Sequence, residues 1–252
     1  MIQPTKRFSN RVADYIRYRP SYPPEVIETL RRQCDLGVGS AVADIGSGTG
    51  IFTALLLNTG ARVYGVEPND EMRLAGESAL SGHAGFRSVC GTAEATELPG
   101  ASVDLITVAQ AFHWFRPEET RREFRRILRP SGWTALIWNT RDDSLPFHRH
   151  YDALLRRYSP EYADSNHTDT VGNPGVRSFF GEGFAGTHTF KNGQLLDLAS
   201  LKGRTNSSSY CPTPDSPNHA PLMAGLDTLF AKHAVGGKVS FGYITEVHLG
   251  RV

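Results

Sequence analysis

VADIGSGTG, residues Val42 to Gly50, is the stretch that decides the fold. Its apolar run ends in Asp44, and glycines then follow at alternate positions, 46, 48 and 50. The next segment, Ile51 to Leu57 (IFTALLL), is rich in helix-forming residues. This order predicts a buried strand, a tight turn and the start of a helix. Glycines let the backbone of such a turn approach a ligand closely, and the unpaired amides at the helix start can hold a negative group.

A second apolar run that ends in an acid follows in the chain. Ala61 to Asn69 reads ARVYGVEPN and carries Glu67. An acid at the end of the second strand is where an α/β nucleotide site binds ribose hydroxyls. The dinucleotide fingerprint also needs a third glycine at position 51, where this chain has Ile51. From the residues alone, two alternatives stay open. The loop could bind a dinucleotide, or it could be an ordinary turn whose glycines are there for steric reasons only.

The G-x-G-x-G pattern after Asp44 resembles motif I of the class I S-adenosylmethionine-dependent methyltransferases. Gly91 to Leu98 (GTAEATEL) is similar to the segment that follows the third strand in that family. The Arg-Pro-x-Tyr-Pro pattern in residues 8–23 resembles a group of small, type 11-like methyltransferases, which includes the trans-aconitate type and acts on carboxylates and other small molecules. The resemblance implies S-adenosylmethionine as the cofactor and a Rossmann-like seven-stranded sheet.

Residue roles follow from this resemblance. In the family, the residues that match Ala93 and Glu94 border the adenine. In the smaller group, the N-terminal segment folds over the cofactor, and an aromatic hydroxyl or the arginine approaches the methionine carboxylate. The matching residues in this chain are Tyr15, Tyr18 and Arg19.

The end of the expected fourth strand points to the reacting centre. Val108 to Phe115 reads VAQAFHWF, and the ligand crevice of an open α/β sheet lies at the carboxyl ends of its strands. We therefore expect Gln110, His113 and Trp114 near the transferred methyl group. His113 could act as a general base, position the substrate, or simply pack beside Trp114. These three roles stay open.

The predicted site can now be given in full. Asp44 is expected to order the loop and the cofactor's amino group, Glu67 to hold the ribose, and Met72 to pack either on the adenine or in the core. His113 is the candidate catalytic residue, His113 and Trp114 form the candidate substrate pocket, and no metal ligands are expected. The predicted cofactor-binding residues are Tyr15, Tyr18, Arg19, Asp44, Gly46, Ser47, Gly48, Gly50, Glu67, Pro68, Met72, Thr92, Ala93, Glu94, Ala109 and Gln110.

Composition narrows the class of protein. The chain has 252 residues, of which 39% are hydrophobic and 21% charged, as in soluble globular proteins. The formal net charge of +1 gives no global field to attract nucleic acid or an anionic membrane. The three cysteines are scattered, without a CxxC pair, so neither a zinc site nor a disulfide framework is expected. With no long apolar run and no leader pattern, we expect a cytoplasmic protein.

Strand and helix patterns alternate from residue 24 to residue 140, which predicts a doubly wound parallel α/β sheet. Beyond it, we expect a tight turn at Asn192 and Gly193, a helix from Ser216 to Ala234 capped by Ser216, and a strand from Val239 to Leu249. We expect one domain over residues 1–252. Its core is residues 24–140 with the C-terminal strands, and segments 1–23 and 141–235 are helical insertions or lids over the carboxyl edge.

The predicted activity is methyl transfer to a small-molecule acceptor, and two rivals stay open. An RNA methyltransferase could use the basic residues of the helix from Pro117 to Arg129 to meet phosphates. The same helix carries Glu118, Glu119 and Glu123, which favours an internally paired face. The chain also lacks an Asn-Pro-Pro-Tyr signature after the fourth strand. The second rival is a protein that binds the nucleotide without catalysis.

Overall fold

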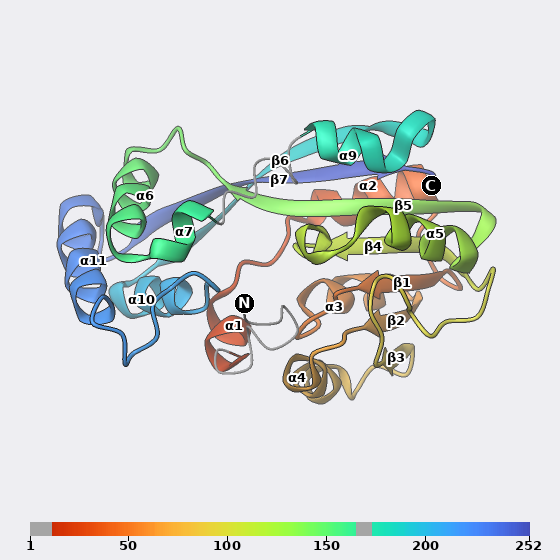
Figure 1. The fold of residues 1–252 in the computed structure, drawn as a ribbon, viewed down its shortest axis with the longest axis horizontal. Coiled ribbons are helices and arrows are strands. Elements are labelled where there is room, and N and C mark those ends of the chain that lie inside the picture. The colour runs from red at the N-terminus through yellow and green to blue at the C-terminus, as the bar shows by residue number, and fades with distance from the viewer. Residues whose placement is uncertain (1–11, 165–172) are drawn as a thin grey trace.

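Seven strands form one mixed sheet in the order β3-β2-β1-β4-β5-β7-β6 (Figure 1). The computed structural model describes residues 12–164 and 173–252. The first five strands are parallel, and β7 runs antiparallel between β5 and β6. The strands are β1 (Ala41–Ile45), β2 (Arg62–Val66), β3 (Phe86–Val89), β4 (Val103–Ala109), β5 (Leu128–Arg141), β6 (Phe184–Leu196) and β7 (Val239–Gly250). The predicted seven-stranded, Rossmann-like α/β sheet is confirmed.

Helices cover both faces and one end of this sheet. They are α1 (Val12–Tyr18), α2 (Pro24–Cys34), α3 (Ile51–Leu57), α4 (Asp70–Leu80), α5 (Pro117–Ile127), α6 (Pro146–Tyr158), α7 (Pro160–Asp164), α9 (Asn173–Phe180), α10 (Leu198–Asn206) and α11 (His219–His233). The described residues also include two short 3-10 turns, η3 (Phe112–Trp114) and η4 (Gly181–Gly183). No helix in the described part of the chain is long and apolar enough to cross a membrane.

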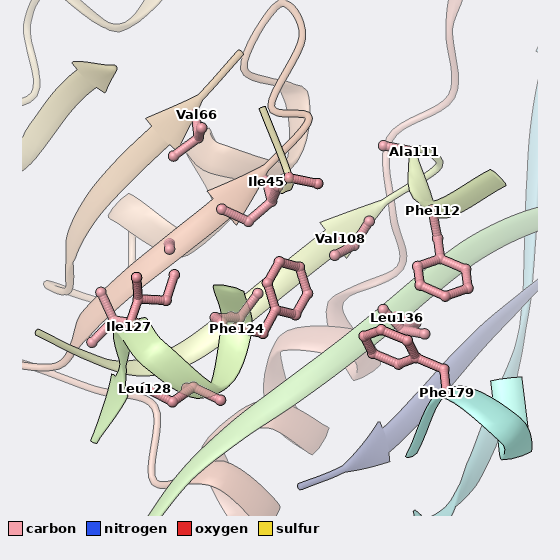
Figure 2. Packing of buried hydrophobic residues seen from close by; sticks show 14 of the residues in the cluster. Ile45, Val66, Val108, Ala111, Phe112, Phe124, Ile127, Leu128, Leu136 and Phe179 are labelled. Carbon is pink, nitrogen blue, oxygen red and sulfur yellow. The ribbon is translucent and has the colours of Figure 1, made fainter. Parts of the chain in front are cut away.

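The parallel half is built on strands that are buried on both faces, as their apolar runs predict. All five residues of β1 are buried. On one face, Ile45 and Val108 pack with Phe124 of α5 and Phe179 of α9 (Figure 2). On the other face, α2 and α3 cover the sheet through apolar residues such as Leu30. This double cover fixes the carboxyl ends of β1, β2 and β4 side by side.

The later part of the chain extends the sheet beyond this core. The long strands β5, β6 and β7 continue past the carboxyl end of β4, and α6, α10 and α11 gather on the extension (Figure 1). A separate apolar cluster holds them there, with Tyr151 and Phe241 among its fully buried members. The expected helical insertion over the carboxyl edge is therefore present, and it brings α10 next to α1.

Two local predictions are wrong. Asn192 and Gly193 do not form a turn, because β6 runs through them and pairs Gly193 with Gly242. The Asn192 amide instead donates to the carbonyl of Ser21 at 2.8 Å, so a tertiary contact overrides the turn preference. The helix predicted from Ser216 begins at His219, because residue 216 lies in a preceding turn.

Glu123 ties α5 to the loop before β4. Its Oε1 accepts hydrogen bonds from the backbone N–H of Thr96 at 2.8 Å and from the Thr96 hydroxyl at 2.6 Å. Its Oε2 accepts from Nε of Arg126 at 2.7 Å. The bond from Arg126, helped by those from Thr96, lowers the pKa of Glu123 to about 2. The loop that follows β3 is thereby fixed to α5.

We expect Glu123→Ala to lower the free energy of unfolding by about 1 to 3 kcal/mol at pH 7, because it leaves the buried Thr96 amide without its acceptor. Since the folded-state pKa of Glu123 lies below its ordinary value of 4.5, the difference from wild type should shrink as the pH falls from 4.5 toward 2. Urea unfolding at several pH values measures this. Glu118→Ala, an exposed change on the same helix, is the matched control, and an equal loss there would contradict the role of Glu123.

Candidate functional site

The loop after β1 is held in a shape that only glycine tolerates at two positions. The φ angles of Gly46 and Gly50 are 69° and 85°, in the left-handed region. A Cβ atom on Gly46 would lie 2.5 Å from Cβ of Ala111, and one on Gly50 would lie 2.7 Å from Cδ1 of Leu80. The loop is therefore packed between η3 and α4, and the predicted strand, turn and helix are present.

Asp44 lies at the end of β1 and joins three elements. Only 1% of its surface is exposed. One carboxylate oxygen accepts from the hydroxyl of Thr53 in α3 at 2.6 Å, and the other accepts from Thr107 in β4 at 2.8 Å. Burial raises the pKa of Asp44 to about 6, although both hydroxyls favour the charged form. Asp44 thus joins β1 to α3 and β4 and carries a buried charge at neutral pH.

Glu67 connects the glycine loop to α4. Its two carboxylate oxygens accept from the backbone N–H groups of Gly48 and Asn69, each at 2.9 Å. Asn69 in turn caps α4 by accepting from the N–H of Met72 at 2.9 Å. Burial raises the pKa of Glu67 above its ordinary value, against these amides, which lower it. Each oxygen has taken one hydrogen bond and retains acceptor capacity for a ligand.

A cavity of about 320 Å³ opens beside Glu67. Most of its lining was predicted from the sequence, whereas Asn69, Ala111 and Arg116 were not. The lining residues are Tyr15, Gly46, Gly48, Glu67, Pro68, Asn69, Met72, Thr92, Ala93, Glu94, Ala109, Gln110, Ala111, Trp114, Phe115 and Arg116. This cavity is shaped by small and apolar groups with two acids at its rim, Glu67 and Glu94.

A second cavity continues along the glycine loop, and the two share Tyr15, Gly46, Gly48, Ala109 and Gln110. Its lining is Tyr15, Arg19, Pro20, Tyr22, Asp44, Gly46, Ser47, Gly48, Thr49, Ile51, Phe52, Ala109, Gln110, Asn139, Arg204 and Tyr243. Sequence reasoning predicted Arg19, Asp44 and Ser47 here, but it missed the contributions of the C-terminal half. The two cavities form one crevice over the carboxyl ends of β1, β2 and β4.

Gln110 lies where the two cavities meet, and its backbone is strained. Its φ is 61°, a left-handed value that is costly for a residue other than glycine. Two bonds hold it: its N–H donates to the carbonyl of Ile137 at 2.9 Å, and its Nε2 donates to the carbonyl of Asn139 at 3.1 Å. Retained strain of this kind is typical of a functional position.

The predicted ligand contacts of four site residues stay predictions, because the structure shows these residues in contact with other parts of the chain. His113 lines neither of the two cavities and packs on Trp114, with ring centroids 4.7 Å apart. Tyr18 also lies outside both linings, against Gly203 of α10. Gly50 serves as the N-cap of α3. One oxygen of Glu94 accepts from the backbone N–H of Arg116 at 2.9 Å, at the start of α5.

The crevice carries charged side chains of both signs. Over the ranges 12–164 and 173–252, no group of three or more metal-binding side chains comes together. The acids Asp44 and Glu67 flank the glycine loop, whose amides lie at the start of α3. The far end of the second cavity is basic, because Arg19 and Arg204 line it. The crevice therefore offers acceptors for hydroxyl and ammonium groups at one end and donors for an anion at the other.

The buried charge of Asp44 should cost stability in the absence of a ligand. We expect Asp44→Asn to raise the free energy of unfolding at pH 8 by about 2 to 3 kcal/mol. Because the pKa of Asp44 is raised in the folded state, the gain should vanish below pH 4 and grow as the pH rises through about 6. Denaturant titrations across this pH range measure it, with Asp104→Asn on β4 as the half-exposed control. A gain that does not depend on pH would contradict the buried charge.

Comparison with known proteins agrees with this geometry. Residues 43–136, from β1 into β5, match the family model of a methyltransferase domain. A methyltransferase of uncharacterised activity from Mycobacterium tuberculosis is 39% identical over 150 residues, which are 60% of this chain and 59% of that protein. The matched part thus spans less than two thirds of such a relative.

Solved structures show the same fold. A protein from Anaeromyxobacter dehalogenans, described as a type II methyltransferase, has a TM-score of 0.66 at 21% identity over 93% of this chain and 98% of that one. Phosphoethanolamine N-methyltransferase 2 of Haemonchus contortus, in complex with phosphomonomethylethanolamine and S-adenosylhomocysteine, has a TM-score of 0.59 at 13% identity over 99% of this chain and 59% of that one. These structures show that the chain has the fold of a methyltransferase, and the family match identifies residues 43–136 as a methyltransferase domain.

Proposed function

We propose that this protein transfers the methyl group of S-adenosylmethionine to a small-molecule acceptor. The observation that carries the proposal is the continuous crevice, in which the glycine loop lies between the two buried acids Asp44 and Glu67. A nucleoside fits the larger cavity, and an amino-acid group fits the start of the second, where both acids and bases are present. The acceptor would take the remaining space toward Asn139 and Tyr243.

Each part of the crevice has a proposed partner on the cofactor. Glu67 would accept hydrogen bonds from the ribose hydroxyls, while Met72 and Ala93 would cover the adenine. Asp44 would attract the positive amino group, and its ionised form is required for this. Arg19, which stacks on Tyr15 with its guanidinium carbon 4.7 Å from the ring centroid, would meet the methionine carboxylate.

The bound cofactor supplies an activated sulfonium methyl group that a nucleophile displaces in line. The protein's part is to hold the acceptor close to that methyl group and to keep water out. Gln110, where the two cavities meet, is placed to orient the acceptor. The strap, residues 12–23, closes the crevice by packing α1 on α10 and α4. A base is needed only when the acceptor is protonated, and His113 is our candidate for that role.

The basic residues of α5 argue against an RNA substrate. Arg126 bonds Glu123 at 2.7 Å, and Arg121 donates to the carbonyl of Phe180 at 3.3 Å. Both side chains already make hydrogen bonds within the protein, so α5 presents a weaker phosphate-binding face than its sequence indicates. This supports a small acceptor over a nucleic acid.

The activity itself is tested by incubating the protein with methyl-labelled S-adenosylmethionine and a panel of small organic acids, alcohols and amines. Label transferred to one class of acceptor supports the proposal. Tight cofactor binding without transfer to any acceptor would favour a non-catalytic binder, and label transferred to RNA would favour the nucleic-acid substrate.

We expect Glu67→Ala to weaken S-adenosylhomocysteine binding by about 1.5 to 3 kcal/mol, the usual cost of losing hydrogen bonds to a charged group. Calorimetric titration measures it. Glu71→Ala, an exposed change in the first turn of α4, is the control. Because Glu67 also anchors Gly48, thermal melting must show that the variant is folded. Unchanged affinity would contradict the ribose assignment.

We expect His113→Ala to lower kcat about 100-fold or more, as loss of a positioned acid–base group does, with S-adenosylhomocysteine affinity changed less than about threefold. His83→Ala, in the turn before β3, is the matched control. Full activity of the His113 variant would show that this ring serves packing against Trp114 and would remove it from the site.

A further inference from the structure

Arg204 is a buried guanidinium at the far end of the crevice. It belongs to α10, is only 6% exposed, and lines the second cavity. Its Nε donates to the hydroxyl of Tyr243 at 2.9 Å, and its Nη1 donates to the hydroxyl of Ser208 at 3.0 Å. Within the described chain, Nη2 makes no hydrogen bond and no carboxylate lies within ion-pair distance of Arg204.

Arg19 of the strap lies close to Arg204 and adds a second cation. Its Nη2 donates to the carbonyl of Ser207 at 2.9 Å, while its buried Nε has no hydrogen-bond partner among the described residues. Burial, reinforced by the charge of Arg204, lowers the pKa of Arg19. The two guanidinium groups therefore repel each other in a partly buried site.

The nearby Arg141 shows that the fold can compensate a buried guanidinium when it needs to. Its Nη2 lies 3.9 Å from a carboxylate oxygen of Asp152, and its Nη1 donates to the hydroxyl of Tyr210 at 3.2 Å. Among the residues that the structure describes, Arg19 and Arg204 have no such carboxylate. An arginine cannot escape burial by losing its proton, so leaving it unpaired has a large free-energy cost. Such a cost points to an anion that comes from outside the chain.

The two arginines differ in what else they touch, and this assigns them to different anions. Arg19 stacks on Tyr15, which lines both cavities, so it lies beside the proposed amino-acid end of the cofactor. Arg204 lines only the second cavity, together with Asn139 and Tyr243 from the ends of β5 and β7. One anionic group, the methionine carboxylate, can satisfy Arg19. Arg204 needs another.

We propose that Arg204 is the anchor for a carboxylate or phosphate group of the methyl acceptor. This rests on the proposed methyl transfer and names the acceptor class that the same crevice would select. Tyr243 and Ser208 fix the guanidinium on two sides, and Arg204 is part of the cavity lining. A guanidinium held in this way suits the paired oxygens of a carboxylate or phosphate, whereas a neutral acceptor would leave it unpaired.

The test is calorimetric titration of the full-length protein, saturated with S-adenosylhomocysteine, with three probes: succinate, its neutral diamide, and inorganic phosphate. We expect saturable binding of succinate or phosphate and none of the diamide. The probe that binds identifies the group as carboxylate or phosphate. Arg204→Gln should weaken that binding at least about tenfold while changing S-adenosylhomocysteine affinity less than about threefold.

Lys202→Gln is the matched control, because Lys202 lies on the same helix and pairs with Asp227 at 2.6 Å away from the cavity. If thermal melting shows that Arg204→Gln is unstable, Arg204→Lys replaces it. Lysine keeps the positive charge but lacks the paired N–H groups of a guanidinium, so this variant should bind the probe with an affinity below that of wild type but not abolished. Anion binding that is absent, or equal in wild type and the Arg204 variants, overturns the proposal. So does a loss of S-adenosylhomocysteine affinity in the Arg204 variant, which would assign Arg204 to the cofactor.

Failure of methyl transfer is distinguishable from failure of this proposal. If the wild-type protein does not bind S-adenosylhomocysteine, the proposed function fails at the first titration. The anion titrations of wild type, Arg204→Gln and Lys202→Gln can still be made on the free protein. Loss of probe binding confined to the Arg204 variant would then still show that Arg204 is an anion site.

Discussion

The buried carboxylate of Asp44, bonded to Thr53 and Thr107, is the constraint on which the crevice depends. It joins the ends of β1 and β4 to the first turn of α3, and these bonds restrict the backbone conformation of the glycine loop between β1 and α3. Glu67 then fixes the outer side of the same loop through the amide of Gly48. Burial raises the pKa of both acids, while the hydroxyl and amide donors around them favour the charged form.

The C-terminal half completes the crevice from a distance. The extension of β5 and β7 carries α10 to the carboxyl edge of the parallel strands, where it meets the strap (Figure 1). This contact brings residues that are more than 180 positions apart, such as Arg19 and Ser207, into hydrogen-bonding distance. The first half of the chain thus lines the cavity beside Glu67, our proposed nucleotide site, while the second half contributes Asn139, Arg204 and Tyr243 to the cavity beyond it.

Local sequence patterns predicted the first of these contributions but not the second. The glycines, Asp44 and Glu67 follow directly from short runs that end strands, because their roles depend on neighbours close in the chain. Arg204 and Tyr243 acquire their place only when β7 pairs with β5 and α10 packs beside α1, which no local pattern encodes. Asn192 and Gly193 show the same limit, since pairing with β7 overrode a strong turn signal. The positions of His113 and Tyr18 relative to a ligand are likewise matters of packing.

The contact between Tyr18 and Gly203 has a consequence for how this chain can vary. A methyl group on residue 203 would occupy the volume of the Tyr18 ring. A bulky aromatic at one position therefore excludes any side chain at the other while the strap and α10 stay in contact. In homologues that keep this contact, residues 18 and 203 should therefore change together, so that a larger residue at 203 occurs only with a smaller one at 18. Such covariation would be visible in a sequence alignment.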